Sequence, residues 1–600
     1  MSRSQAWTFR IFLLAIAIVG VLVTRHYGES WDELKFYKYA DLSLGAYRTW
    51  LGSGQVPEFG NTYDNYGPAY VMLVTLAARG LQTLLPWSLS DLRHLLYFFT
   101  FLAGLWAFHA LARRWLSRFA AFGATALFAT QPLFWGHAFI SPKDIPFLAF
   151  TLLALLTGLR AFEKLPRFSL DGLTPRSKRN LLVLSALWLF SILALYLGTG
   201  LIHGWIEGAV HAAAAGQTNL VSYLASDLQK VDPGVYVQRY FTLFLGARIL
   251  YSLLFTAGMA LAYRKLAPEA LRATLALLVP ALTLGFATSI RVLGPLAGLI
   301  VALYALRAHG RSVLPALGAY AALSLVVMYA TWPYLWPDPP GRFVESLRVM
   351  SQYPWPGEVL FDGVQYASTN IPRTYLPVLL GVQLTEPVWP LFLAGLALAI
   401  VAWVRRREHL ELVALTALWF ALPLAVFILT RAPLYDNFRQ VFFILPPVFL
   451  LAGVVFEMVK DTTWRIALIG LAVLPGLLAD INLHPYEYIY YNRFIGGGSG
   501  AFRRFEMDYW GTSYREAADW LNGNAPAEAN VWVEGPAHLL DMYLRADLKL
   551  YSTYEAERAD HYDYVVATSR YDLDLRSYPG ARIVHEIERG GAILTVIKQP

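Results

Sequence analysis

The sequence of 600 residues contains no cysteine. This absence excludes disulfide bonds, thiolate catalysis and metal sites with cysteine ligands. Charged residues are scarce too, at 15% of the chain, whereas soluble proteins have about 25%. Sequence motifs for P-loop nucleotide binding, zinc proteases, serine hydrolases and nucleic-acid binding are also missing. What remains is strongly apolar, with 56% hydrophobic residues and a mean hydropathy of +0.43.

Apolar runs of about 17–23 residues recur along the chain, and each is long enough to cross roughly 30 Å of hydrocarbon. We therefore predict an all-α polytopic membrane protein with about 13 transmembrane helices. The predicted spans are residues 8–24, 92–112, 119–136, 145–162, 181–203, 241–263, 272–290, 292–308, 312–332, 387–404, 411–430, 441–459 and 465–482.

One further apolar run, from Gly67 to Pro86, is predicted to lie flat at the membrane interface. If it crossed the bilayer, the basic loop 163–180 and the run Arg405 to Arg407 would fall outside the cell. If it lies flat, both fall in the cytoplasm, where membrane proteins concentrate Lys and Arg. Arg79 in the middle of the run also favours the interface, because a charge at the bilayer centre is costly.

The charge pattern predicts the orientation in the inner or plasma membrane as well. The basic segment Met1–Arg10 before the first span indicates an uncleaved signal anchor with a cytoplasmic N-terminus. The long segments 25–91, 204–240, 333–386 and 483–600 then lie outside. Most polar motifs fall on this extracytoplasmic face.

From about residue 510 the composition becomes that of a soluble domain. Ser513–Asn522 has helical spacing, and Asn530–Val533, Tyr564–Ala567 and Ala592–Ile597 read as short strands. We predict a transmembrane domain over residues 1–482, whose first external loop, 25–91, contains interfacial helices. An extracytoplasmic C-terminal region over 483–600 follows, with a small α/β domain in it.

Three acids follow the first span within five positions: Glu29, Asp32 and Glu33. A carboxylate held near the bilayer surface can act as a general base toward an acceptor hydroxyl or amine. Alternatively, Asp32 caps the helix that follows. The spacing alone leaves both readings open.

Two polar turns carry further candidates. Asn61–Pro68 contains Asp64 and Tyr66 and has the hydrogen-bonding groups of a sugar site, although a simple turn beside an aromatic belt explains it equally well. In His137–Pro146, Lys143 can pair with a phosphate and Asp144 can orient it. The alternative is a solvated turn in which Asp144 caps a helix.

Four arginines lie at the extracytoplasmic ends of spans, against the usual charge trend: Arg291, Arg373, Arg431 and Arg439. A guanidinium binds a phosphate through two hydrogen bonds, so an anionic lipid phosphate explains the set. Snorkelling, or pairing with acids such as Asp436, explains any one of them.

Two aromatic and proline-rich stretches, Trp332–Pro339 and Tyr353–Pro356, are also predicted outside the membrane. Rings fixed beside prolines could form a wall for a sugar or a lipid chain. An interfacial aromatic belt is the alternative.

These motifs, in this order, resemble those of the GT-C membrane glycosyltransferases, which include protein O-mannosyltransferases and the aminoarabinose transferases of lipid A. The resemblance is to the bacterial branch called glycosyltransferase family 39 or RgtA/B/C/D-like, and it covers most of residues 1–510. The motifs that carry it are Trp31-Asp32-Glu33, Ser141–Phe147, Ser289-Ile290-Arg291, Trp332–Trp336, Tyr435–Arg439, His484–Tyr488, Tyr490–Asn492 and Glu506–Gly511.

The resemblance implies a polyprenyl-phosphate sugar donor and inverting transfer on the extracytoplasmic face. It implies Asp32 as the base, with Glu33 beside it and Asp144 as a further acid of the site. We expect the substrates to contact Lys143, Arg291, Arg373, Arg439, Tyr66, Asp64 and Tyr435. Lys143 and Gln440 stand where the family often has Arg and His, a departure at two expected phosphate contacts.

The expected partners are the lipid-linked donor, membrane lipids and a lipid, glycan or protein acceptor, with no nucleic acid. We expect no cofactor and no resident metal site, and leave a divalent cation open. The main alternative is a lipid or polysaccharide transporter, which also places charges in a membrane cavity. Transporters often have internally symmetric halves, which this sequence lacks. A structural protein would leave the Asp32 cluster without a role.

Overall fold

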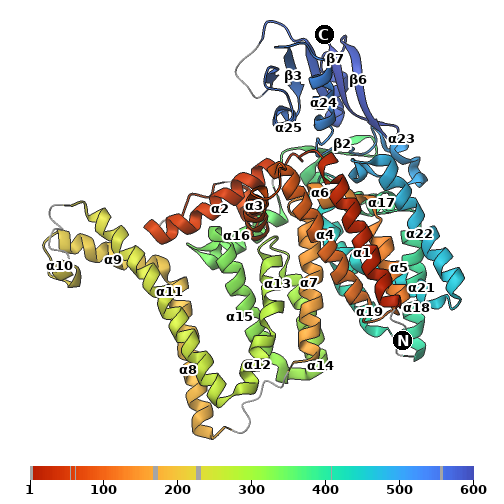
Figure 1. Cartoon of the computed structure of the whole chain (residues 1–600). Coiled ribbons are helices and arrows are strands. Elements are labelled where there is room, and N and C mark those ends of the chain that lie inside the picture. Colours follow the sequence, from red (N-terminus) through yellow and green to blue (C-terminus); the bar gives the residue numbers. More distant parts are fainter. Residues whose placement is uncertain are drawn as a thin grey trace. The chain divides into compact units, whose positions relative to one another are not determined.

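The computed structural model describes residues 4–53, 56–60, 62–165, 173–224, 231–353, 355–406, 409–553 and 559–600. Asn61, Pro354, Arg407 and part of the loop 163–180 lie outside these ranges. Ten of the described helical segments are long and apolar enough to cross a membrane. The chain is thus a mostly helical, multi-pass membrane protein with a small sheet in its C-terminal region, as predicted (Figure 1).

Two predicted spans form shorter helices than expected. The run 119–136 gives α5 (Arg118–Ala129), and the run 441–459 gives α21 (Pro446–Met458). Proline explains both, because it lacks a backbone N–H and starts helices more readily than it continues them. Pro132 starts a new helix after α5, and Pro446 and Pro447 start α21. The count of 13 spans stays a prediction.

The run predicted to lie at the interface forms α3 (Ala69–Gln82), which has 14 residues. A helix of that length is about 21 Å long, too short for roughly 30 Å of hydrocarbon. Its length therefore agrees with an interfacial helix, and its orientation stays a prediction.

The chain divides into two compact units. The first comprises residues 1–37, 73–156 and 351–600, and the second comprises 38–72 and 157–350. Four helices contribute residues to both units, namely α2 (Glu33–Ser53), α3, α7 (Asp144–Glu163) and, by its last residue, α16 (Pro339–Ser351). The predicted boundary at residue 482 stays a prediction.

The first unit is built around a buried helix, α21. Its apolar residues face inward on nearly all sides, and it packs against α18 and α5, as expected for a helix that is hydrophobic all round. The other helices of this unit are α1 (Ser4–Val23), α4 (Leu89–Ala112), α6 (Pro132–Ile140), α17 (Tyr375–Gln383), α18 (Val388–Arg406), α19 (Leu410–Thr416), α20 (Leu422–Thr430), α22 (Thr462–Leu483), α23 (Gly497–Ala501), α24 (Tyr514–Asn524), α25 (Ala537–Asp541) and α26 (Leu573–Arg576).

The C-terminal part of the first unit carries a five-stranded mixed sheet of order β4-β3-β5-β7-β6. Its strands are β3 (Asn530–Glu534), β4 (Lys549–Ser552), β5 (Tyr564–Thr568), β6 (Arg582–Arg589) and β7 (Ala592–Gln599). The central strand β5 is parallel to β3 and antiparallel to β7, and it is buried along its whole length. The helix and three strands predicted from the sequence are confirmed, and the edge strands β4 and β6 were not anticipated.

A short hairpin of β1 (Glu358–Phe361) and β2 (Val364–Ala367) precedes this region. Its two-residue loop is Asp362-Gly363, and both residues have positive φ, 50° and 80°. Two such residues in succession make the tight turn that fits the twist of antiparallel strands. The hairpin packs on the segment that contains Phe505, since the N–H of Gly363 donates to the carbonyl of Arg504 at 2.9 Å.

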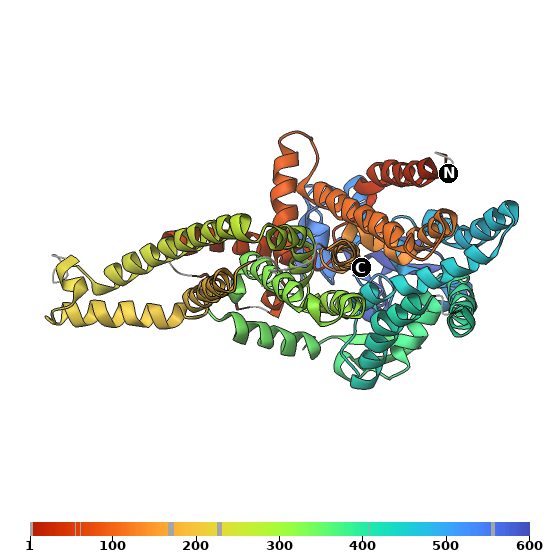
Figure 2. The ribbon, with the colours of Figure 1, turned by 90° about the horizontal axis from the view of Figure 1, so that it is seen from below.

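In the second unit, α8 and α9 run beside α11, as both views show (Figures 1 and 2). A turn at Gly67 lies so close to Ser289 that an added Cβ would be 2.1 Å from the Ser289 carbonyl oxygen. The helices of this unit are α8 (Pro175–Leu197), α9 (Thr199–Ala214), α10 (Leu220–Leu224), α11 (Pro233–Leu266), α12 (Pro268–Ala276), α13 (Leu278–Thr288), α14 (Pro295–His309), α15 (Leu314–Thr331) and α16 (Pro339–Ser351).

Candidate functional site

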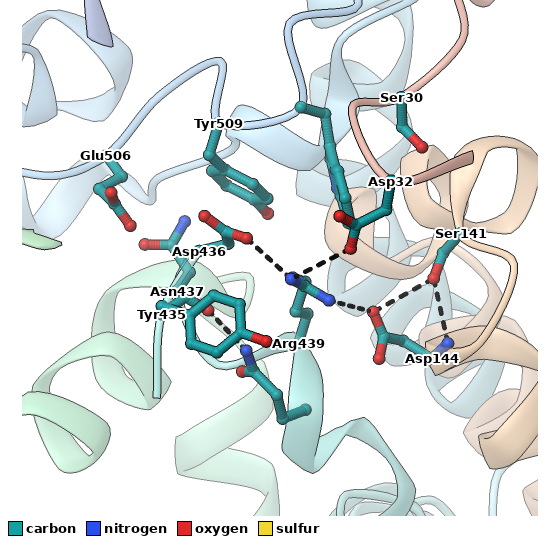
Figure 3. Close-up of polar contacts among 12 residues, drawn as sticks. Ser30, Asp32, Ser141, Asp144, Tyr435, Asp436, Asn437, Arg439, Glu506 and Tyr509 are labelled. Carbon is teal, nitrogen blue, oxygen red and sulfur yellow. Dashed lines mark hydrogen bonds and ion pairs between the residues drawn. The ribbon is translucent and has the colours of Figure 1, made fainter. Parts of the chain in front are cut away.

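The centre of the candidate site is the guanidinium of Arg439, which is 1% exposed (Figure 3). Nη1 donates to Asp144 Oδ2 at 3.0 Å, and Nη2 donates to Asp436 Oδ2 at 2.7 Å. Nη2 also lies 3.8 Å from Asp32 Oδ2. One arginine, which keeps its charge at any physiological pH, thus gathers three carboxylates from distant parts of the sequence.

Asp32 has a second cationic neighbour, because Lys143 Nζ donates to its Oδ2 at 2.9 Å. Burial alone would raise the pKa of Asp32, but the charges of Lys143 and Arg439 outweigh it and lower the pKa below its ordinary value. The Asp32 side chain is 15% exposed, whereas that of Asp144 is 0% exposed and that of Asp436 is 8% exposed. Asp32 is therefore an ionised carboxylate and the one of these three most open to a substrate.

The turn before α2 determines where Asp32 and Glu33 point. Glu33 Oε2 accepts from the backbone N–H of Ser30 at 2.6 Å, and Oε1 accepts from the Tyr37 hydroxyl at 2.7 Å. His94 Nε2 is 3.1 Å from the same carboxylate. These contacts hold Glu33 in a separate buried cluster, so the structure does not bring it to the Arg439 network. Its predicted part in catalysis stays a prediction.

Asp144 begins α7 but does not serve as its cap. The hydroxyl oxygen of Ser141 accepts the Asp144 backbone N–H at 3.1 Å. The Asp144 carboxylate is therefore available to Arg439, as Figure 3 shows. The Ser141-Pro142-Lys143-Asp144 turn thus supplies a cation to Asp32 and an anion to Arg439.

The C-terminal sheet extends this network through Arg570, two residues after the end of β5. Its Nη2 donates to Asp436 Oδ1 at 2.7 Å and lies 3.4 Å from Glu506 Oε1, and its Nη1 donates to the Tyr509 carbonyl at 2.9 Å. Asp436 therefore bridges two buried arginines. The sequence reasoning missed Arg570, although a charged residue at the carboxyl end of a buried parallel strand is a recognisable signal.

Glu506 ends the network on this side. Burial, against the opposing charge of Arg570, raises the pKa of Glu506 to about 7. Its Oε2 makes no hydrogen bond within the ranges that the structure covers. Glu506 therefore changes charge near neutral pH, unlike Asp32.

Aromatic rings cover Arg439. Its guanidinium lies 4.4 Å from the ring centre of Trp510 and 5.2 Å from that of Tyr435. Tyr435 stacks on Trp355 with 4.6 Å between ring centres and 19° between ring planes. Tyr435 and Trp355, which the sequence analysis singled out separately, thus form one wall beside the network.

The second unit contains the other polar motif that the sequence indicated. Arg291 lies 5.8 Å from the ring centre of Tyr66. The Asp64 backbone carbonyl accepts from Trp332 Nε1 at 3.2 Å. Tyr66, Asp64 and Arg291 are all buried. Three residues predicted to bind substrate are thus gathered in one part of this unit.

Two of the four arginines that the sequence predicted at the extracytoplasmic ends of spans lie neither in the cluster around Arg439 nor in the one around Arg291. Arg373 is exposed in the turn before α17, and Arg431 is exposed at the end of α20. Neither makes an ion pair with another residue that the structure describes. A role for Arg373 in phosphate binding therefore stays a prediction.

No group of three or more His, Asp or Glu side chains is placed to hold a metal ion within the part of the chain that the structure describes. Each of the acids around Arg439 is paired with a cationic side chain of the protein. Charge balance in this cluster therefore comes from the chain itself.

Comparison with protein-family models gives no match, and comparison with curated proteins gives none either. Three solved structures resemble this chain at low sequence identity. The apo oligosaccharyltransferase of Archaeoglobus fulgidus is 15% identical with a TM-score of 0.36, over 94% of this chain and 70% of that one. ArnT from Cupriavidus metallidurans, bound to undecaprenyl phosphate, is 15% identical with a TM-score of 0.26, over 98% of each chain. The arabinofuranosyltransferase AftD from Mycobacteria is 12% identical with a TM-score of 0.36, over 98% of this chain and 41% of that one.

Two of these proteins are named as sugar transferases, the class of enzyme that the sequence resemblance indicates. Membership of the family 39 branch stays a prediction. Because every TM-score is below 0.5, we take neither the site nor the reaction from these likenesses.

Proposed function

We propose that this chain is an integral membrane glycosyltransferase that transfers a sugar from a polyprenyl-phosphate donor to an acceptor hydroxyl. The observation that carries the proposal is the Lys143–Asp32–Arg439–Asp144 cluster. It places an ionised, partly exposed carboxylate beside two cations. General-base catalysis needs the carboxylate, and stabilisation of a departing phosphate needs the cations.

In the proposed reaction, Asp32 takes the proton of the acceptor hydroxyl, and the hydroxyl oxygen forms a bond to the anomeric carbon. The bond from that carbon to the phosphate oxygen breaks, and its electron pair leaves with polyprenyl phosphate. A single displacement of this kind inverts the configuration at the anomeric carbon. Lys143 and Arg439 stabilise the charge that develops on the leaving phosphate.

The remaining residues have supporting roles in this proposal. Asp144 and Asp436 fix the guanidinium of Arg439 from two sides, so its orientation is set before substrate binds. Glu33 holds the turn that carries Asp32 through the Ser30 N–H. Tyr435 contributes a ring surface to the donor, and Arg373 contacts the substrates. The substrate contacts expected from Arg291, Tyr66 and Asp64 in the second unit stay predictions.

We place the reaction on the extracytoplasmic face of the inner or plasma membrane. This orientation is supported by the basic loops predicted in the cytoplasm and by the short basic N-terminus. The C-terminal region, which supplies Arg570, then lies on the same face as Asp32.

The test is to supply the purified full-length protein with a set of polyprenyl-phosphate sugars and to measure the polyprenyl phosphate released. We expect Asp32→Asn to lose about 10²–10⁴-fold in rate. Asp41→Asn, at an exposed aspartate in α2, the helix that follows Asp32, is the control and should keep the wild-type rate. Equal rates in Asp32→Asn and wild type would remove Asp32 from the role of base. Lipid movement in liposomes without any turnover would favour a transporter.

A further inference from the structure

The backbone of the turn 28–32, which precedes α2, is fixed by the C-terminal region of the same unit. The N–H of Glu29 donates to the Tyr543 hydroxyl at 3.0 Å. The N–H of Trp31 donates to the Trp510 carbonyl, also at 3.0 Å. Both donors are backbone groups, so these bonds do not depend on the side chains of the turn. Neither bond fixes the turn relative to the lysine with which its aspartate pairs.

The side chain of Ser30 makes that connection. It is 0% exposed, and its hydroxyl donates to the Ile140 carbonyl at 2.8 Å, so it points toward the turn that carries Ser141 (Figure 3). Ser30 lies two positions before Asp32. Ile140 lies three positions before Lys143. The hydrogen bond therefore joins two segments that are 110 positions apart in sequence, close to the charged groups that they carry.

The backbone of Ser30 is held as firmly as its side chain. Its N–H donates to Glu33 Oε2 at 2.6 Å, and its carbonyl accepts from the Glu33 N–H at 3.0 Å. The partner of its hydroxyl, Ile140, is the last residue of α6, where carbonyls have no partner within the helix. The N–H, the carbonyl and the hydroxyl of Ser30 are thus all engaged. A displacement of either segment is passed to the other through this one residue.

This connection sets the spacing of the charged groups around Asp32. The charges that act on its carboxylate are Lys143, 2.9 Å away, Arg439, 3.8 Å away, and Lys35 of α2. The segment after α6 supplies the first of these cations directly and holds the guanidinium through Asp144. A general base has to lie within about 2.6–3.2 Å of the atom whose proton it takes. A small drift of Asp32 away from this segment therefore changes both its charge environment and its reach.

We propose that Ser30 is a positioning residue, whose hydroxyl holds the turn that carries Asp32 against the turn that carries Lys143. Its effect on turnover rests on the proposed function, because Asp32 is the base in that reaction. Ser30 contacts no reacting atom and acts only through Asp32. The alternative is that the hydroxyl merely caps α6, a role that would affect stability and leave the aspartate unchanged. The two roles are separable, because only positioning alters the charge environment of Asp32.

The test is the rate at which a carbodiimide modifies Asp32, whose side chain is 15% exposed, measured by mass spectrometry. Carbodiimides react with a protonated carboxyl group, so between about pH 4 and pH 6 this rate follows the pKa of Asp32. Burial acts to raise that pKa, but Lys143 and Arg439 outweigh it. Ser30→Ala in the full-length protein weakens their attraction, so the rate should rise about threefold, the result of a pKa increase of about half a unit. An unchanged rate would overturn the proposal.

Further variants separate positioning from a loss of stability. Thr130→Val removes another buried hydroxyl, which donates to the Ala126 carbonyl at 2.9 Å, and should leave the rate at Asp32 unchanged. In the Lys143→Met background no lysine remains to be aligned, so Ser30→Ala should raise the rate by only about 1.5-fold. An equal factor in both backgrounds, as capping of α6 or a general loosening of the turn predicts, would refute positioning. Ser30→Cys keeps a weaker donor, so it should give a smaller increase, and it replaces the alanine variant if that does not fold.

The transfer assay separates this proposal from the proposed function. With a donor that the wild type uses, Ser30→Ala should lower kcat about tenfold to hundredfold, because misplacing a catalytic group by about 1 Å can cost about 10²-fold. The KM for the donor should change by less than about twofold, since the lost alignment matters in the transition state. Turnover by the wild type with an unchanged kcat in Ser30→Ala refutes the positioning role alone. A faster carbodiimide reaction in Ser30→Ala without turnover of any donor refutes the proposed reaction and leaves the placement of Asp32 by Ser30 intact.

Discussion

Glu506→Gln should stabilise the protein at alkaline pH and not at acidic pH. Burial raises the pKa of Glu506 from an ordinary 4.5 to about 7, a net effect that already includes the attraction of Arg570. Folding therefore favours the protonated form. Above pH 7 the folded protein carries a buried charge that the unfolded chain would hold in water, and below about pH 4.5 both states are protonated. The difference between the two pKa values corresponds to about 3 kcal/mol against folding at high pH.

Glutamine has the same shape and no charge, so the variant does not lose folding free energy by burying a charge at high pH. Side-chain exposure of Glu506 is 3%, and solvent therefore screens the effect little. In a unit of this size about 3 kcal/mol amounts to a rise of only a few °C in melting temperature, expected at pH 8 and absent at pH 4.5. Thermal melts of the detergent-solubilised protein at both pH values measure it. Glu528→Gln, at an exposed glutamate, is the control and should show no difference between the two pH values. An equal shift at both pH values, or a loss of stability at pH 8, would refute the reasoning.

Two further predictions test the site and the second unit. Lys143→Met removes a cation that lowers the pKa of Asp32, so the fall of kcat/KM toward acidic pH should begin at a higher pH. Between pH 7 and pH 5, kcat/KM should fall about tenfold more than in the wild type. Lys143→Arg should keep the wild-type pH profile of kcat/KM, and an unchanged profile in Lys143→Met would contradict the pairing. Gly67→Ala should lower the melting temperature by the equivalent of about 1–3 kcal/mol, because its Cβ would meet the Ser289 carbonyl. Gly45→Ala in α2, where a Cβ meets nothing within 4 Å, should instead raise stability by about 1 kcal/mol.

The sequence was sufficient to predict the helical membrane fold, and it singled out Asp32, Lys143, Asp144 and Arg439 without predicting that they meet. The spans follow from length and hydropathy, which are local properties. The four residues were singled out one by one, from local motifs whose order resembles that of a known superfamily. Its geometry could not be derived from spacing, because Arg439 and Asp32 are about 400 positions apart and meet only through packing.

The grouping of Glu33 with Asp32 shows a limit of reasoning from sequence that elementary geometry could have revealed. Asp32 lies in the turn directly before α2 and Glu33 is the first residue of the helix, and neighbouring side chains at such a point leave the chain in different directions, so the two do not face the same site. The structure has Glu33 bound to Ser30 and Tyr37 and Asp32 bound to Lys143. Proximity in sequence was therefore a poor guide to a shared role.

The partners of Asp436 were the least predictable part of the site. Asp436 was noted only as a neighbour for an arginine, and nothing in the local sequence links it to Arg570, which comes 134 positions later. The β1–β2 hairpin was missed for a different reason, since its Asp362-Gly363 pair is a strong turn signal. In that case the information was present in the sequence and was not used.

The position of Arg570 has a consequence for the exchange of parts between related proteins. A chimera that took its C-terminal region from another protein would remove one of the two cations that hold Asp436. The remaining acids would then outnumber their cations in a buried place, and Arg439 would be pulled from the orientation in which it meets Asp32. The C-terminal sheet therefore cannot be treated as an interchangeable module, and a working graft must carry a guanidinium at the end of the strand that corresponds to β5.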